Sequence, residues 1–144
     1  MKNRMKQNGF TLVELMVVAI IVAILAAVAI PLMSAQKKRA AATEGEAGLG
    51  VMRSAMRANF AESGSYSIDA RDQSTIVAPV TVTASNMPGV NGSDLNGRYF
   101  QMGDYQIFSV SANAYVLRVT GSTTDVAGVS IDLDQAGNFV RRGL

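Results

Sequence analysis

The hydrophobic and polar positions of this chain divide it into stretches with different patterns. From Leu15 to Met33, nineteen consecutive positions carry no polar side chain. A helix rises about 1.5 Å per residue, so this run matches the roughly 30 Å hydrocarbon thickness of a bilayer. The pattern predicts a transmembrane helix that is apolar on every side.

The residues that follow this run become amphipathic. Leu49, Met52, Met56 and Phe60 recur at spacings of three and four, which places them on one face of a helix. Charged residues fall off this stripe. We therefore expect residues 34–63 to form the second half of the same helix, with the stripe packed on a small sheet of the same chain.

Three glycines, Gly45, Gly48 and Gly50, interrupt this second half. Each costs about 1 kcal/mol relative to alanine in a helix interior. Because the surrounding alanines favour a helix, we expect the glycines to serve close packing rather than to break it. Gly64 is the expected C-cap.

Residues 64–98 are polar and rich in Ser, Thr, Asn and Gly. They are predicted to form a long connecting loop, with at most a short strand at Ile76–Thr83. Loops of this length are uncommon and often form functional or variable surfaces. Asp69, Arg71 and Asp72 are expected to form an exposed cluster here, without a catalytic arrangement.

Strand signals follow closely one after another in residues 99–144. Short polar gaps between strands favour an antiparallel meander over parallel crossovers. The predicted fold class is therefore α+β, a long N-terminal helix whose first half is transmembrane, packed against a small antiparallel sheet. The expected strands are Tyr105–Val110, Tyr115–Thr120, Val129–Asp134 and a closing Phe139–Arg142.

Composition argues against an enzyme. The chain has no cysteine and no histidine, so it lacks a disulfide framework, a thiolate and the commonest general base. We expect no enzymatic activity and no cofactor. Three of the thirteen basic residues lie in Met1–Gly9, and without them acidic residues outnumber basic ones, so nucleic-acid binding is not indicated.

One group of residues in the predicted sheet resembles a metal site. Asp132, Asp134 and Asn138 carry the oxygen ligands that calcium prefers. Ala136 stands where an EF-hand pattern needs another ligand, so these three residues are only weak metal candidates. A turn in which the Asx side chains bond the local backbone is favoured instead.

The basic leader, Met1–Gly9, and the apolar run together allow two plain interpretations. A secretory signal peptide would end at the small residues Ala27-Val28-Ala29, but the run exceeds the usual ~7–15 apolar residues. A membrane anchor is the other interpretation. Basic residues lie on both sides of the run, at Lys2, Arg4 and Lys6 and at Lys37–Arg39, so charge alone leaves its orientation open.

Charges on the second half of the helix form separate blocks. Lys37–Arg39 is basic, whereas Glu44 and Glu46 are acidic. By default both blocks are expected to form a solvated face. Segregated blocks also suit pairing between staggered subunits, and Lys37–Arg39 suits contact with lipid headgroups.

Glu14 has two interpretations. Thr11-Leu12-Val13-Glu14 fits a capping box ahead of an apolar helix. Alternatively, an acid in a spanning helix costs on the order of 2.5–3.5 kcal/mol at its centre, and less near its end. No residue of the helix neutralises Glu14, so a cation would come from a new α-amino group or from another subunit. The residues alone favour neither interpretation.

The motif as a whole is more specific. Gly9-Phe10-Thr11-Leu12-Val13-Glu14-Leu15, after a short basic leader and before an apolar helix containing Pro31, resembles the type IV pilin and pseudopilin family. The resemblance covers about the first sixty residues and also implies a pilin-like fold. One departure is Ala23, where a glycine is often found. Pro31 is expected to kink the helix because it lacks an N–H.

The resemblance implies specific processing. Residues 1–9 would be a leader removed by a prepilin peptidase, which cuts after Gly9 and methylates the amine of Phe10. Residues 10–33 would be the transmembrane and polymerisation helix. Thr11 and Pro31 match the pattern, and Glu14 would meet the N-terminal amine of a neighbouring subunit.

The implied function is that of a structural subunit of a type IV pilus or pseudopilus. The implied partners are copies of itself or other pilins, the peptidase, the assembly machinery and inner-membrane lipid. The leader would be cytoplasmic, and the chain would move from the inner membrane to a pilus or a periplasmic pseudopilus. The alternative is a small secreted or signal-anchored binding domain that does not polymerise.

Overall fold

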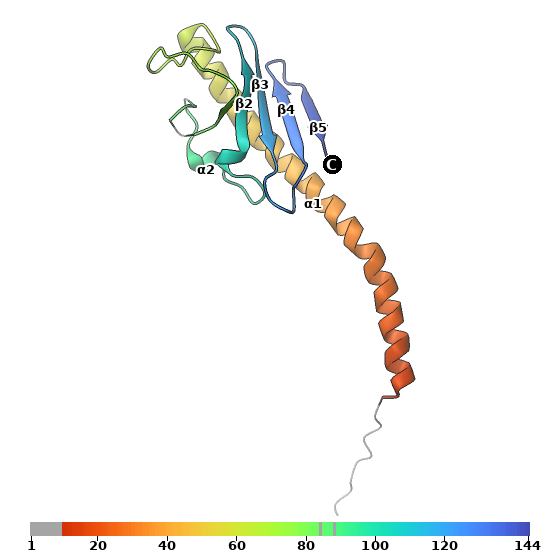
Figure 1. The fold of residues 1–144 in the computed structure, drawn as a ribbon. Coiled ribbons are helices and arrows are strands. Elements are labelled where there is room, and N and C mark those ends of the chain that lie inside the picture. The colour runs from red at the N-terminus through yellow and green to blue at the C-terminus, as the bar shows by residue number, and fades with distance from the viewer. Residues whose placement is uncertain (1–9, 84, 88) are drawn as a thin grey trace, which may run out of the picture. The chain divides into compact units, whose positions relative to one another are not determined.

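The computed structural model describes residues 10–83, 85–87 and 89–144, which fall into two compact units. The first unit extends to Ser34, and the second, which we call the head unit, is Ala35–Leu144. Helix α1, Leu12–Ser63, belongs to both units (Figure 1). Its first part, up to Ser34, lies in the first unit, and its second part lies in the head unit.

The first part of α1 is helical although many of its residues are β-branched. In hydrocarbon each backbone N–H and C=O needs a partner within the chain, and a helix supplies all of them. The helix continues through Pro31. The kink expected there stays a prediction.

The head unit contains one five-stranded antiparallel sheet in sequential order β1-β2-β3-β4-β5. Together with α1 it confirms the predicted α+β class, with the sheet and the second part of α1 as two layers (Figure 1). A β-bulge between Ile107 and Ser109 interrupts the pairing of β2 with β3. The strands are β1 Val80–Thr81, β2 Tyr105–Val110, β3 Tyr115–Thr120, β4 Ser130–Asp134 and β5 Phe139–Arg142.

The core lies between α1 and the sheet. Leu49, Met52 and Met56 are fully buried, whereas Phe60 is half-buried and stacks on Tyr66 with ring centroids 4.4 Å apart. Alternate residues of the central strands supply the opposing apolar layer. These are Tyr105 and Ile107 of β2, Tyr115, Leu117 and Val119 of β3, and Ile131 and Leu133 of β4.

Two glycines let the sheet approach α1 closely. A Cβ on Gly45 would lie 3.0 Å from Ile131 Cδ1, and a Cβ on Gly48 would lie 2.2 Å from the hydroxyl oxygen of Tyr105. The expected packing role is therefore confirmed at these two positions. A Cβ on Gly50 would have no neighbour within 4 Å among the described residues, so a packing role there stays a prediction.

The connection between α1 and β2 contains more structure than expected. Gly64 ends α1 with a φ of +74° and donates its N–H to the carbonyl of Phe60, which confirms it as the C-cap. The predicted strand in Ile76–Thr83 is the short β1. The short helix α2, Gly92–Leu95, and the 3₁₀ helix η1, Met102–Asp104, were not expected.

We predict that Gly48→Ala destabilises the head unit by about 1–3 kcal/mol, because its methyl group would displace the buried ring of Tyr105. Gly50→Ala is the matched control and should stabilise α1 by up to about 1 kcal/mol, since open space surrounds that position. Urea denaturation of the detergent-solubilised chain measures both. Equal effects of the two substitutions would contradict the packing role of Gly48.

Candidate functional site

Glu14 and Thr11 close the first turn of α1. The backbone N–H and the hydroxyl of Thr11 each donate to Glu14 Oε2 at 2.8 Å, and the N–H of Glu14 donates to the Thr11 hydroxyl at 3.2 Å. This reciprocal arrangement is the predicted capping box, and it satisfies N–H groups that the helix leaves without a partner. Both oxygen-bearing side chains are exposed.

Phe10 precedes this turn and has 83% of its surface exposed. Its neighbour Gly9, the expected cleavage site, lies outside the described residues.

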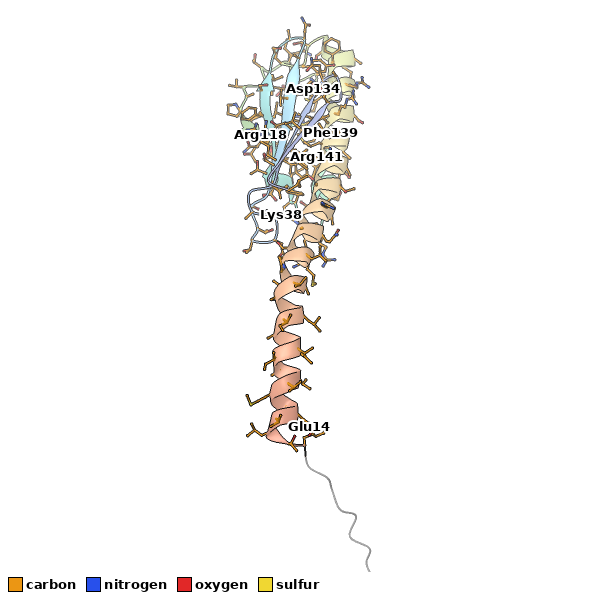
Figure 2. All side chains as sticks on the ribbon, turned by 90° about the vertical axis from the view of Figure 1, so that its right-hand side faces the viewer. Glu14, Lys38, Arg118, Asp134, Phe139 and Arg141 are labelled. Carbon is orange, nitrogen blue, oxygen red and sulfur yellow. The ribbon has the colours of Figure 1, made fainter. Side chains whose placement is uncertain are left out.

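The apolar side chains of the first unit project on all sides of α1 around and beyond Glu14 (Figure 2). Leu12, Leu25 and Ile30 have between 65% and 74% of their surface exposed. By length and composition the helix is able to cross a membrane, and its most apolar window is 0% buried within the described chain. Such a surface requires lipid or other helices as its environment.

The acidic residue Glu44 of α1 binds backbone groups of the head unit, which the sequence did not predict. Glu44 accepts the backbone N–H groups of Arg98, Tyr99 and Phe100 at 3.1, 2.8 and 2.9 Å. A Cβ on Gly97 would lie 2.3 Å from the same carboxylate, so a larger residue there would displace the carboxylate from these N–H groups. The expectation that Glu44 belongs to a solvated face is therefore wrong.

Glu46 has a partner within the chain as well. Its carboxylate accepts a hydrogen bond from Arg141 Nε of β5, with which it forms a salt bridge. Periodicity places Glu44 and Glu46 on the helix surface but does not reveal which loop or strand covers that surface. Glu46 is therefore half-buried and paired within its own chain, although Arg141 stays exposed.

Asp132 joins three strands on the outer face of the sheet. Arg118 of β3 donates to both its oxygens at 2.6 and 2.9 Å, and Arg142 of β5 donates to Oδ2 at 2.7 Å. The Arg118 guanidinium also lies 3.5 Å from the ring centroid of Phe108. The hydrogen bond from Arg118 is the main reason why the pKa of Asp132 is lowered, although burial opposes it.

Asp134 organises the turn between β4 and β5. Its carboxylate accepts the backbone N–H groups of Gly137 and Asn138 and the side-chain amide of Asn138, at 2.8–2.9 Å. The hydrogen bonds from Asn138 lower its pKa. These bonds confirm the predicted Asx turn, and they show that Asp132 and Asp134 use their oxygens for guanidinium and amide donors.

The predicted cluster of Asp69, Arg71 and Asp72 differs from its prediction at Asp69, whereas Arg71 and Asp72 are exposed as expected. Asp69 is buried rather than exposed, and Arg71 binds it through Nε and Nη2, the latter at 2.5 Å. The side-chain hydrogen bond from Arg71 lowers the pKa of Asp69. Arg71 also donates to the carbonyl of Ser85, so the pair fastens the connecting segment rather than forming an exposed site.

Sequence reasoning missed most of these contacts. Arg118 and Asp132 face each other in the register of β3 and β4, so alternation of the two strands carried a usable signal for that pair. No pattern pointed to Glu44, because its partners are backbone N–H groups more than fifty residues away.

The chain was compared with known proteins. Residues 4–30 match the family model described as the prokaryotic N-terminal methylation motif. Neither the comparison with curated proteins nor that with solved structures yields a match.

The matched segment lies at the start of a helix that is long and apolar enough to cross a membrane. Residues 4–30 are the prepilin-type cleavage and methylation segment of type IV pilins, as the resemblance of Gly9–Leu15 implied.

We predict a pH dependence for Asp132. Because its pKa is lowered in the folded chain, the ion pairs stabilise the fold above the ordinary Asp pKa of about 3.9, and this stabilisation is lost as the pH falls through the lowered pKa. Asp132→Asn should cost about 2 kcal/mol at about pH 7, less at about pH 2.5. Denaturant titrations at both pH values measure the difference.

The exposed Glu62 provides the control. Glu62→Gln should change the free energy of unfolding by no more than about 0.5 kcal/mol at either pH. A cost of Asp132→Asn that does not shrink in acid would contradict an electrostatic role for Asp132.

Proposed function

We propose that this chain is a structural subunit of a type IV pilus or pseudopilus. The precursor waits in the inner membrane, is cleaved after Gly9 and methylated at Phe10, and assembles into a helical filament through residues 10–33. The observation that carries the proposal is the methylation motif at residues 4–30, followed by an apolar helix that no described residue covers.

Packing of apolar helices supplies the driving force for assembly. In the membrane the side chains of residues 12–33 contact lipid, and in a filament they contact the same helices of other subunits. Lipid tails are as apolar as these side chains, so close van der Waals packing, rather than the hydrophobic effect, favours the filament. An additional polar interaction then selects the arrangement of the subunits.

Glu14 is suited to supply that interaction. The contacts with Thr11 use Oε2, and Oε1 accepts no hydrogen bond from a described residue. A carboxylate has lone pairs for several donors, so Glu14 can keep its cap and still bind an ammonium group. We propose the amine of Phe10 in a neighbouring subunit as that group, with Thr11 and Pro31 as parts of the same assembly surface.

The orientation and location follow from this role. The leader lies in the cytoplasm and the head unit on the outer side of the inner membrane. After assembly the chain lies in a pilus at the cell surface or in a periplasmic pseudopilus. Its partners are copies of itself or other pilins, the prepilin peptidase and the assembly machinery.

We predict that the mature protein begins with methylated Phe10, which N-terminal sequencing and mass spectrometry detect. Gly9→Leu should abolish this cleavage, because a bulky side chain would occupy the cleavage position, whereas Asn8→Gln is the neighbouring control and should be processed. A mature start at Ile30 would indicate ordinary secretion, and an intact Met1 a plain anchor. Either start in the unmodified protein contradicts the proposal.

We predict that Glu14→Ala and Glu14→Leu are processed but form few or no filaments. Glu14→Gln separates the two roles of this residue, because a glutamine at this position of a capping box still accepts hydrogen bonds but carries no charge. If the charge is required, Glu14→Gln loses filaments as Glu14→Ala does. The measurement is filament yield by electron microscopy of sheared material, with Glu62→Gln as the control. A wild-type filament yield from Glu14→Gln would contradict a role for the charge and leave Glu14 only its role as a helix cap.

A further inference from the structure

A basic cluster marks the start of the head unit. Lys37, Lys38 and Arg39 are the first charged residues of the head unit, and no acidic residue of this unit precedes Glu44. We call these three residues the basic collar. Figure 2 shows Lys38 at one end of the head unit and Asp134 at the other.

Two lysines of the collar contact segments that are distant in the sequence. Lys37 Nζ forms a salt bridge of 3.1 Å with Asp125, in the connection between β3 and β4. Lys38 Nζ donates to the carbonyl of Gly143 at 3.0 Å, which holds the C-terminus. The last residue, Leu144, has 52% of its surface exposed.

The collar retains capacity for further anionic partners. A lysine ammonium has three N–H donors, and each of the two lysines uses one of them within the described chain. The side chain of Arg39 donates to no described residue and is exposed. Lys37 is also about half exposed, with a relative side-chain accessibility of 47%.

The position of the collar, directly after the apolar run, determines which chemical groups surround it. Lys37 follows Met33, the last residue of the apolar run, by four positions, which is roughly 6 Å along a helix. When residues 10–33 span the bilayer, Lys37–Arg39 therefore lie in the headgroup layer. Phosphate groups of anionic lipids are the charges available there, and basic residues next to a membrane bind them.

We propose that the basic collar, with the β3–β4 connection and the C-terminus that it fastens, is a docking surface for anionic phospholipid headgroups. This inference rests on the proposed membrane-anchored precursor. The collar holds the base of the head unit on the outer leaflet, with Leu144 facing the interface. Binding is electrostatic, so it weakens at high salt and on a neutral membrane.

The absence of cysteine makes the test direct. Thr124→Cys places a single dye in the β3–β4 connection, and Asn113→Cys places one in the β2–β3 turn at the opposite end of the sheet. The full chain is reconstituted into vesicles of phosphatidylcholine, with or without phosphatidylglycerol, together with a quencher on lipid headgroups. We expect phosphatidylglycerol to increase quenching at Thr124→Cys but not at Asn113→Cys, and salt to reverse the increase.

Matched charge removals identify the surface. Lys38→Gln/Arg39→Gln removes two positive charges from the collar, and Arg57→Gln/Arg98→Gln removes two from exposed positions elsewhere in the head unit. The first variant should lower the ratio of docked to free head roughly fivefold for each residue removed, whereas the second should leave it unchanged. Release of the C-terminus alone would change quenching equally in both kinds of vesicle.

Equal quenching with and without phosphatidylglycerol, or equal effects of the two double variants, would overturn the proposal. Flotation of the vesicles tests membrane insertion separately. A chain that floats but does not respond to phosphatidylglycerol contradicts the docking surface alone. A chain that does not float contradicts the membrane-anchored precursor, and failure of filament assembly alone leaves the docking result standing.

Discussion

The apolar surface of residues 12–33 is the constraint on which this molecule depends. Fifteen large apolar side chains lie exposed there, and burial of each contributes roughly 1.5–3 kcal/mol. Burying all of these side chains would therefore contribute a few tens of kcal/mol of free energy, which the described chain alone does not gain. The segment is stable only in lipid or among other helices. A single polar interaction, the capping box of Thr11 and Glu14, closes its first turn. The proposed processing and assembly both act at that same end.

The second part of α1 differs from the first part, because its own chain covers one of its faces. Gly45 and Gly48 remove side-chain bulk where Ile131 and Tyr105 approach, while Leu49, Met52 and Met56 fill the space between the layers. One helix thus changes from an all-round apolar surface to a one-sided core surface. The change comes from composition along the chain, and no break in the helix is required.

Polar contacts hold the last strand in a chain that has no disulfide. All four residues of β5 are exposed, so apolar burial alone fastens it weakly. Backbone pairing with β4 is supplemented by Arg141 with Glu46, Arg142 with Asp132, and Lys38 with the carbonyl of Gly143. Exposed ion pairs contribute little one by one, but here three separate polar contacts link the C-terminal segment to α1 and to β4. The same contacts keep the C-terminus beside the basic collar.

The sequence by itself determined the membrane-type helix, the processing motif and the α+β class, because nineteen apolar residues, GFTLVEL and strand alternation are local patterns. It also determined three of the five strands to the residue and Gly64 as the cap. Only the tertiary structure decided the partners of Glu44, Glu46 and Asp69. Periodicity says which side chains share a face of an element, but the donors that reach that face come from segments remote in the chain. Helix α2 was not predicted, because a helix of four residues is too short to show a helical periodicity.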